Sequence, residues 1–306
     1  MNSKKSLILG STAISLSAIM WGFDGVVLTP RLANLDIVFV VFILHAIPFL
    51  FMSFLFSGQF RYLKTFSIND YFFLILIAVF GGAIGTIAIV KALFLVNFQH
   101  LTVVVLLQKL QPAFAIALSA VFLNEKPGKN YLLWASVAIT GGYFLTFGFH
   151  FPDLDSGANT MYAALFALLA SFSFGGSTVF SKKVLNRYSF QTATFFRYGF
   201  TAVIMLVVVL FSSNFFDQLE LTTKLNWLIF LIIAFTTGSG AIFLYYYGLK
   251  RVKAIVGTIC ELFFPISAVI FDYFINGAKL TFVQWVSAVI MIFAIINLNI
   301  ERNKHT

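Results

Sequence analysis

Long apolar stretches, separated by short polar segments, run through the whole chain. A helix that crosses a bilayer needs about 20 predominantly apolar residues, and ten stretches satisfy this requirement. They cover residues 7–28, 35–57, 71–95, 101–123, 129–148, 158–180, 190–213, 225–248, 254–276 and 281–300. The pattern predicts an all-α integral membrane protein with ten transmembrane helices, and the segments between them are too short to form a core of their own.

Basic residues gather on one side of the predicted membrane. With the N-terminus placed in the cytoplasm, the cytoplasmic segments hold 14 of the 20 Lys and Arg residues, and the outer loops hold three. The positive-inside rule requires such an asymmetry. We therefore expect a multi-pass protein of the plasma membrane, here a bacterial inner membrane, with both termini in the cytoplasm. A cleaved signal peptide is not expected, because its removal would invert the charge balance of every loop.

Composition agrees with this topology. Hydrophobic residues make up 60% of the chain and charged residues 10%, and the mean hydropathy is +0.95. The net charge of +9 follows from the cytoplasmic segments and implies attraction to anionic membrane lipids, so no nucleic acid partner is expected. The lone cysteine, Cys260, lies inside the ninth stretch and excludes an intramolecular disulfide.

The two halves of the chain resemble each other. A shift of 153 residues places Pro112 on Pro265 and Gln108 on Glu261, so that the fourth and ninth stretches coincide. A shift of 156 residues aligns the third and eighth stretches in the same way.

Each half, 1–150 and 151–306, holds five predicted spans, and the odd number requires the second half to be inverted in the membrane. Two inverted five-helix repeats are the usual architecture of secondary transporters, whose substrate site lies near the midplane between the halves.

Short motifs occupy matching places in the two halves. They are Trp21-Gly22, Leu110-Gln111-Pro112, Leu123-Asn124-Glu125-Lys126 and Glu261-Leu262-Phe263-Phe264-Pro265. On these motifs the chain resembles the drug/metabolite transporter superfamily, EamA type. The resemblance implies solute transport, commonly the export of amino acids or related metabolites. The superfamily also includes exchangers of nucleotide sugars and of phosphorylated metabolites.

Two positions depart from the pattern of that superfamily. The acidic residue that usually closes the proline-containing helix is present as Glu125, but Ala278 replaces it in the second half. The basic residue that is frequent in the second span is His45 here, whereas its counterpart in the seventh span is retained as Arg197.

Charged side chains inside a span need a partner or a function, because each costs at least about 2.5 kcal/mol at the bilayer centre. Lys109 lies deep in the fourth span, where Gln108 and Gln111 keep the same turn polar. Lys109 either meets an anionic or carboxylate-bearing cargo or pairs with Asp24 of the first span. Lys91, near the outer end of the third span, either reaches the headgroups or also pairs with Asp24.

A run of three tyrosines ends at Tyr247 in the eighth span. Consecutive residues point in different directions around a helix, so at most one or two of them can face a central cavity. We take Tyr247 as the candidate, and an interfacial anchor is the alternative. The expected substrate-binding residues are therefore Lys109, Gln108, Gln111, Asp24, Lys91 and Tyr247.

Three further residues are candidates for coupling transport to protons. Glu261 lies at a depth similar to that of Arg197, and it either forms a structural ion pair with Arg197 or carries a proton. His45 could also titrate near neutral pH, although a lone histidine in a span more often bonds to a neighbouring helix.

Motifs of other protein classes are missing from the sequence. It contains no phosphate-binding loop, no HExxH and no G-x-S-x-G, so neither an ATP-driven pump nor a hydrolase is expected. We expect a secondary transporter that moves a small polar metabolite, such as an amino acid or related carboxylate, by alternating access and in the direction of export. An exchanger of phosphorylated or other anionic metabolites is the alternative. No catalytic residue, metal or cofactor is expected.

Overall fold

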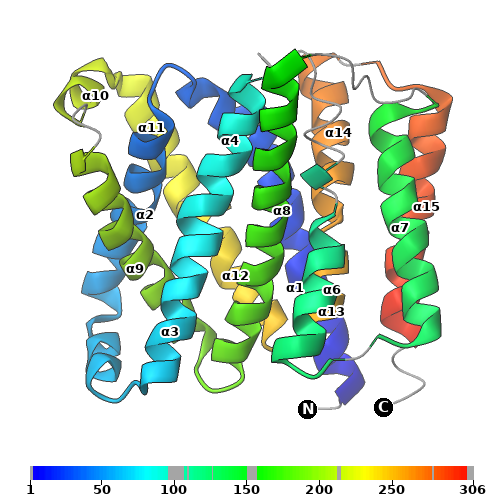
Figure 1. Ribbon diagram of the computed structural model, residues 1–306, viewed down its shortest axis with the longest axis horizontal. Coiled ribbons are helices and arrows are strands. Elements are labelled where there is room, and N and C mark those ends of the chain that lie inside the picture. Colours follow the sequence, from blue (N-terminus) through cyan, green and yellow to red (C-terminus); the bar gives the residue numbers. More distant parts are fainter. Residues whose placement is uncertain are drawn as a thin grey trace.

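The protein is described by a computed structural model that covers residues 3–95, 107–108, 110–125, 127–149, 157–211, 215–277 and 279–301. Every regular element in these ranges is a helix. Figure 1 shows the helices side by side, with α1 beginning and α15 ending at the same edge of the bundle.

The first half contains α1 Ser3–Phe23, η1 Asp24–Leu28, η2 Thr29–Leu32, α2 Ile37–Leu55, η3 Ser57–Lys64, α3 Ile68–Ile77, η4 Ala78–Ile84, α4 Gly85–Leu95, α6 Gln111–Phe122 and α7 Lys129–Phe147. The second half contains α8 Gly157–Leu185, α9 Phe190–Phe211, α10 Phe215–Leu221, α11 Lys224–Ile233, η5 Ala234–Gly238, α12 Ser239–Leu249, α13 Ala254–Cys260, α14 Phe263–Asn276 and α15 Phe282–Glu301.

Seven helical segments are long and apolar enough to cross a membrane. They are Lys4–Leu32, Ile37–Leu55, Ile68–Ala92, Met161–Leu185, Phe190–Phe211, Lys224–Leu249 and Ala254–Asn276. The three other predicted spans correspond to α6, α7 and α15, and α6 and the apolar part of α15, Phe282–Asn297, are shorter than a full crossing. The chain is thus a multi-pass helical membrane protein.

Two spans end later than predicted. The first span does not end at residue 28, because π and 3-10 turns extend it to Leu32. The sixth span was predicted to end at residue 180, but α8 continues to Leu185. This last turn stays helical because Lys182 is buried, and its Nζ donates to the backbone carbonyls of Leu249 and Lys250.

The halves are interleaved rather than side by side. Helix α1 packs against α12, α13 and α14 of the second half, and α8 packs against α3, α4 and α6 of the first. The remaining long helices pair across the halves, α2 with α9 at one side of Figure 1 and α7 with α15 at the other. Each half therefore contributes helices both to the group around α1 and to the group around α8.

Two glycines that the shift of 153 aligns make matching contacts. A Cβ at Gly22 would lie 3.0 Å from the carbonyl oxygen of Phe264 and 2.9 Å from the amide nitrogen of Ala268. A Cβ at Gly175 would lie 2.9 Å from the carbonyl oxygen of Gln111 and 3.0 Å from the amide nitrogen of Ala115, the two residues that precede Phe264 and Ala268 by 153. Only glycine allows backbones to approach this closely.

Helices α3 and α11 begin with equivalent caps, 156 residues apart. Ser67 and Asp70 form a capping box at α3, and Thr223 and Asn226 form one at α11. Each box contacts the segment that follows the first helix of the other half. Asp70 accepts from Arg187 and Tyr188, which follow α8, and Asn226 donates to Arg31 and Asn34, which follow α1. The π segments η4 and η5 also begin 156 residues apart, at Ala78 and Ala234.

One end of the bundle carries a cluster of cations where α8 is followed by α9 and α12 by α13. We call it the basic end, and its residues are Lys182, Lys183, Arg187, Lys250, Arg251 and Lys253. In Figure 1 it is the lower edge, where α1 begins, while α10 lies at the opposite edge. Near the basic end, burial and the hydrogen bond to Asp70 raise the pKa of the Tyr188 hydroxyl to about 12.

Candidate functional site

Glu261 lies where the ninth span is interrupted between α13 and α14. Pro265 has no N–H and cannot donate to the carbonyl of Glu261, four residues earlier. The amide of Phe264 donates to this carbonyl instead, over 2.9 Å, and the amide of Leu262 bonds to Ile259 over 3.1 Å. The proline thus tightens the chain into a turn that carries the Glu261 side chain, which is half-buried.

Residues of three helices, α6, α8 and α12, meet at the carboxylate of Glu261. Its Oε1 accepts from the hydroxyls of Tyr245, at 2.6 Å, and Thr178, at 3.2 Å. Its Oε2 accepts from Nε2 of Gln111 at 2.7 Å. We call Gln111, Thr178, Tyr245 and Glu261 the carboxylate cluster. Its donors are neutral, so they satisfy the carboxylate oxygens without cancelling the charge.

The two hydroxyl groups of the carboxylate cluster have fewer hydrogens than the three contacts that they make with each other and with Glu261. Thr178 and Tyr245 also approach each other, with 2.9 Å between their oxygens. Each hydroxyl has one hydrogen to donate. Because two hydrogens serve three contacts, a relay from Thr178 through Tyr245 to Glu261 satisfies the two shortest ones.

Arg197 on α9 belongs to a second cluster. Its Nη1 donates to the hydroxyl of Tyr246 at 3.1 Å, and its Nη2 donates to the carbonyl of Gly81 at 3.2 Å. The Tyr246 hydroxyl also lies 2.7 Å from Oγ of Ser181. We call Gly81, Ser181, Arg197 and Tyr246 the arginine cluster. The Nε of Arg197 is buried and has no hydrogen-bond partner among the described residues.

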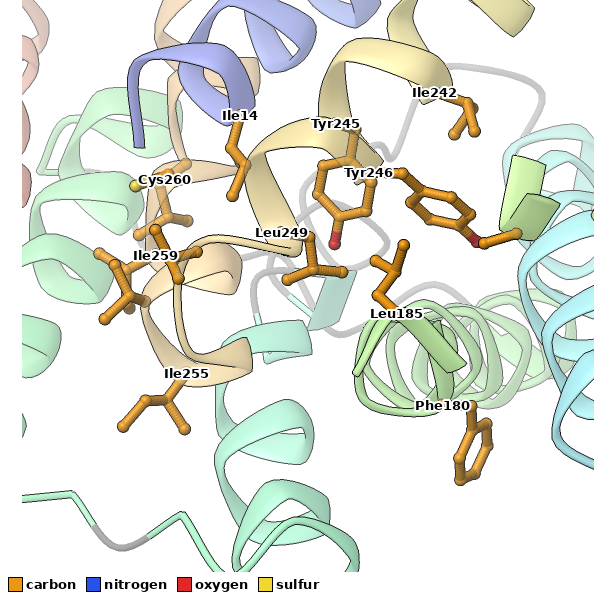
Figure 2. Packing of buried hydrophobic residues seen from close by; sticks show 14 of the residues in the cluster. Ile14, Phe180, Leu185, Ile242, Tyr245, Tyr246, Leu249, Ile255, Ile259 and Cys260 are labelled. Atoms are coloured by element: carbon orange, nitrogen blue, oxygen red, sulfur yellow. The ribbon is translucent and has the colours of Figure 1, made fainter. Parts of the chain in front are cut away.

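The ion pair between Glu261 and Arg197 does not form. Across the described ranges, the acid and base that approach within 4.0 Å are Asp70 and Arg187. Tyr245 and Tyr246 are adjacent on α12, and their rings leave the helix in different directions (Figure 2). Tyr245 bonds to the carboxylate and Tyr246 to the guanidinium.

Asp24 has hydroxyl partners rather than a lysine. It opens the π segment η1, and its carboxylate accepts from Thr29 at 2.9 Å and from Thr237 of η5 at 3.0 Å. Lys91 is exposed, and its Nζ lies 5.1 Å from the ring centroid of Phe166. The suggested pair of Asp24 with Lys91 is therefore absent from the described structure. Lys109 lies outside the described residues, so its pairing with Asp24 stays a prediction.

The other candidates lie apart from Glu261. His45 bonds through Nδ1 to the carbonyl of Val41 in its own helix, over 2.8 Å, rather than to a neighbouring helix. Tyr247 lies under the guanidinium of Arg251, with 3.4 Å between the guanidinium carbon and the ring centroid, near the basic end. Gln108 is half-buried just before the turn that leads into α6. Among the candidates that the structure describes, Gln111 and Glu261 are the two in direct contact.

The sequence interpretation missed the hydroxyl residues of α8. A buried stripe on this helix consists of Ser171, Ser173, Ser177, Thr178 and Ser181. Thr178 belongs to the carboxylate cluster and Ser181 to the arginine cluster. The Oγ atoms of Ser173 and Ser177 have no partner among the described residues. Native proteins leave few buried polar atoms unpaired, and such atoms commonly bind water or a ligand. The density of Ser and Thr between residues 171 and 181 was the available signal.

An aromatic surface lies beside the carboxylate cluster. The ring of Trp21 on α1 is half-buried, and its centroid is 5.3 Å from that of Tyr245, at an interplanar angle of 53°. The carboxylate of Glu261 therefore has hydrogen-bond donors at both oxygens and an indole ring nearby.

A multi-pass helical bundle with a polar centre between its two halves is typical of membrane transporters. The chain belongs to the EamA-like transporter family, which it matches twice, over residues 8–147 and 161–300. The expected family is thereby confirmed, and the protein is a transporter rather than an enzyme.

Two similar proteins bear on this chain. It is 55% identical over 293 residues to the protein named riboflavin transporter ImpX of Fusobacterium nucleatum subsp. nucleatum, and the match covers 95% of this chain and 98% of the relative. A solved structure described only as a crystal structure of a protein has a TM-score of 0.69 and 15% identity, covering 93% of this chain and 95% of the other. At that identity the likeness concerns the fold alone.

Proposed function

We propose that this chain moves riboflavin, or a molecule with the same ring system, across a bacterial plasma membrane by alternating access. The observation that carries the proposal is the 55% identity to a named riboflavin transporter over nearly the whole length of both chains. The name of that relative does not support the amino acid or related carboxylate that the family resemblance implied. Export stays a prediction.

The chemistry of the carboxylate cluster supports a flavin cargo. Riboflavin is uncharged, and one edge of its flat ring system carries an imide, an N–H between two carbonyls. A carboxylate oxygen of Glu261 can accept from such an N–H, and the second amide hydrogen of Gln111 can donate to a carbonyl beside it. The ring of Trp21 offers a stacking surface next to Tyr245. Ligand sites combine apolar walls with a few converging polar groups in this way.

We further propose that ten spans form two inverted five-helix repeats, with the basic end in the cytoplasm. The matching contacts of Gly22 and Gly175 and the equivalent caps of α3 and α11 support the repeat. The cations at the basic end support its orientation. Alternating access then exposes the carboxylate cluster to each side in turn.

A phosphorylated flavin is the second candidate cargo. The observation that favours it is Arg197, a half-buried cation whose described partners are a hydroxyl and a backbone carbonyl. Its Nε is buried and unpaired among the described residues. Arginine binds phosphate with two parallel hydrogen bonds. Exchange of anionic metabolites is consistent with this arrangement.

Thermal unfolding of the purified protein tests the cargo assignment. A ligand present at 100 times its Kd stabilises the folded state by about 2.7 kcal/mol. We expect riboflavin to raise the Tm, and a mixture of amino acids to leave it unchanged. A larger shift with flavin mononucleotide favours the second candidate, and a shift with amino acids alone contradicts both.

A pair of tryptophan variants locates the binding site. Trp21→Leu removes the ring beside Tyr245 and is expected to lower the flavin-induced shift. Trp134→Leu is the matched control, because Trp134 on α7 packs against Phe293 of α15, away from the carboxylate cluster. Equal loss of the shift in both variants contradicts a site at Trp21.

A further inference from the structure

The start of α13 is capped by a carboxylate from the first half of the chain. Glu125, which follows α6, is buried. Its Oε1 accepts from the amide of Ala254 at 3.1 Å, and its Oε2 accepts from the amide of Ile255 at 3.2 Å. The first N–H groups of a helix have no partner within it and carry partial positive charge, so a carboxylate is well matched to them.

The end of α12, a few residues before the start of α13, is capped by a cation from α8. The Nζ of Lys182 on α8 donates to the carbonyl of Leu249 at 2.9 Å and to that of Lys250 at 3.2 Å. The last carbonyls of a helix carry partial negative charge, which a lysine complements. Both ends of the connection between α12 and α13 are thus held by buried charges.

These caps join the two parts of the bundle at the basic end. One part consists of α8 with α3, α4 and α6, and the other of α1 with α12, α13 and α14. Ala254 of the second part packs in a buried cluster with Ala115 and Val179 of the first. The connection therefore lies against α6 and α8, so the two parts are in contact at the basic end.

The positions that the repeat aligns with Glu125 and Lys182 carry no charge in the sequence. The shift of 153 residues carries Glu125 to Ala278 and Lys182 to Thr29. Thr29 donates to Asp24 at 2.9 Å, within the same part of the bundle. A third charge is also absent from the matching position, because Asp70 near the basic end corresponds to the neutral Asn226 near the opposite end.

We propose that Glu125 and Lys182 form a latch that holds the basic end closed and favours the conformation open at the opposite end. The latch rests on alternating access, which is part of the function proposed above, but it does not depend on the identity of the cargo. Breaking either cap removes a charge-assisted bond that exists only while the basic end is closed. The population open at the basic end then rises.

Accessibility of a single cysteine tests the latch. Thr258 lies between Ala254 and Glu261 at helical spacing, is buried, and has no hydrogen-bond partner among the described residues. Thr258→Cys in a Cys260→Ser background places one thiol behind the closed basic end. A membrane-impermeant maleimide applied to right-side-out or inverted vesicles then measures access from each side.

Glu125→Gln and Lys182→Met remove the charge and keep most of the side-chain volume. We expect each to raise the rate of labelling from the side of the basic end roughly tenfold. Lys182→Arg, which retains the cation, should label like the parent. Lys183→Met is the matched control, because Nζ of Lys183 donates to the carbonyl of Phe122 and so joins α8 to α6 within one part of the bundle.

Unchanged labelling in both latch variants overturns the proposal, and so does an equal rise in Lys183→Met. Loss of folding in both latch variants, judged by size-exclusion profile while Lys183→Met folds, also overturns it, because a latch is not required for the fold. The readout needs no cargo. Raised labelling without flavin transport supports the latch and contradicts the cargo assignment. Flavin transport with unchanged labelling supports the cargo assignment and contradicts the latch.

Discussion

Gln111 donates from Nε2 to Oε2 of Glu261 over 2.7 Å, and this bond joins the two halves of the chain at the interruption of their proline-containing spans. Pro112 and Pro265 occupy matching places in those spans. Each proline removes a backbone donor, so the polar side chains beside it lie where regular helix gives way to a turn. The contact makes the centre of the protein a junction between the halves, which any relative movement of them must change.

Removing the hydroxyl of Tyr245 is expected to weaken transport at the carboxylate cluster. Tyr245→Phe deletes the shortest bond to Glu261, and a bond to a charged group is worth about 1.5–3 kcal/mol. We predict at least a tenfold loss of initial transport rate. Tyr247→Phe is the control, since the Tyr247 ring packs under Arg251 near the basic end. Equal losses in the two variants would place the effect in α12 as a whole rather than in the cluster.

Glu261→Gln separates proton coupling from architecture. The amide of Gln111 can turn to present its oxygen to the new NH2 group, and Arg197 keeps its bonds to Tyr246 and Gly81, so we expect a folded protein of similar Tm. If Glu261 carries the coupling proton, flux loses its dependence on a pH gradient while downhill exchange continues. Wild-type pH dependence in a well-folded Glu261→Gln protein would rule this residue out as the coupling site.

A methyl group at Gly22 should destabilise the packing of α1 against α14. Its Cβ would lie 2.0 Å from Oγ of Ser267 and 2.9 Å from the backbone nitrogen of Ala268, which cannot rotate away. Overpacking of this kind costs about 1–3 kcal/mol, so Gly22→Ala is expected to lower the Tm. At Gly25 the nearest atom, on the Phe264 ring, is 3.9 Å away, and Gly25→Ala should unfold like the wild type. A lowered Tm in Gly25→Ala alone contradicts the close approach of α1 and α14 at Gly22.

Sided labelling of single cysteines tests the proposed orientation. In a Cys260→Ser background, a cysteine at the exposed position Asn186, next to the basic end, should react with an impermeant reagent only from the cytoplasmic side. A cysteine at Asp155, in the acidic segment 149–157 between the halves, should react only from outside. The reverse pattern contradicts the proposed orientation, and labelling of both positions from the same side contradicts the inverted repeat.

Hydropathy predicted the helices best where a polar cap bounds an apolar run. The second span was expected at 35–57 and is α2, Ile37–Leu55, which Asp36 caps by accepting from the amides of Val38 and Phe39. The end of α8 was missed because a lysine normally marks the end of a span. Lys182 instead stays in the helix and bonds to the end of α12, a contact that no local pattern encodes.

The candidate site was predicted only in part. The repeat identified Glu261 and the polar turn around Gln111, which are in contact. Depth in the membrane does not specify direction around a helix, so the pairing of Glu261 with Arg197 was wrong. The hydroxyls of Thr178 and Tyr245 were missed because such residues are as common in ordinary helix packing as in binding sites.

Flavin flux through the reconstituted protein tests the central claim most directly. Radiolabelled riboflavin is added to proteoliposomes that contain the wild type or Tyr245→Phe. The account predicts saturable entry of chemically unchanged riboflavin, competed by unlabelled riboflavin but not by amino acids, and reduced at least tenfold in the variant. Absence of riboflavin flux in vesicles that transport an amino acid would contradict it.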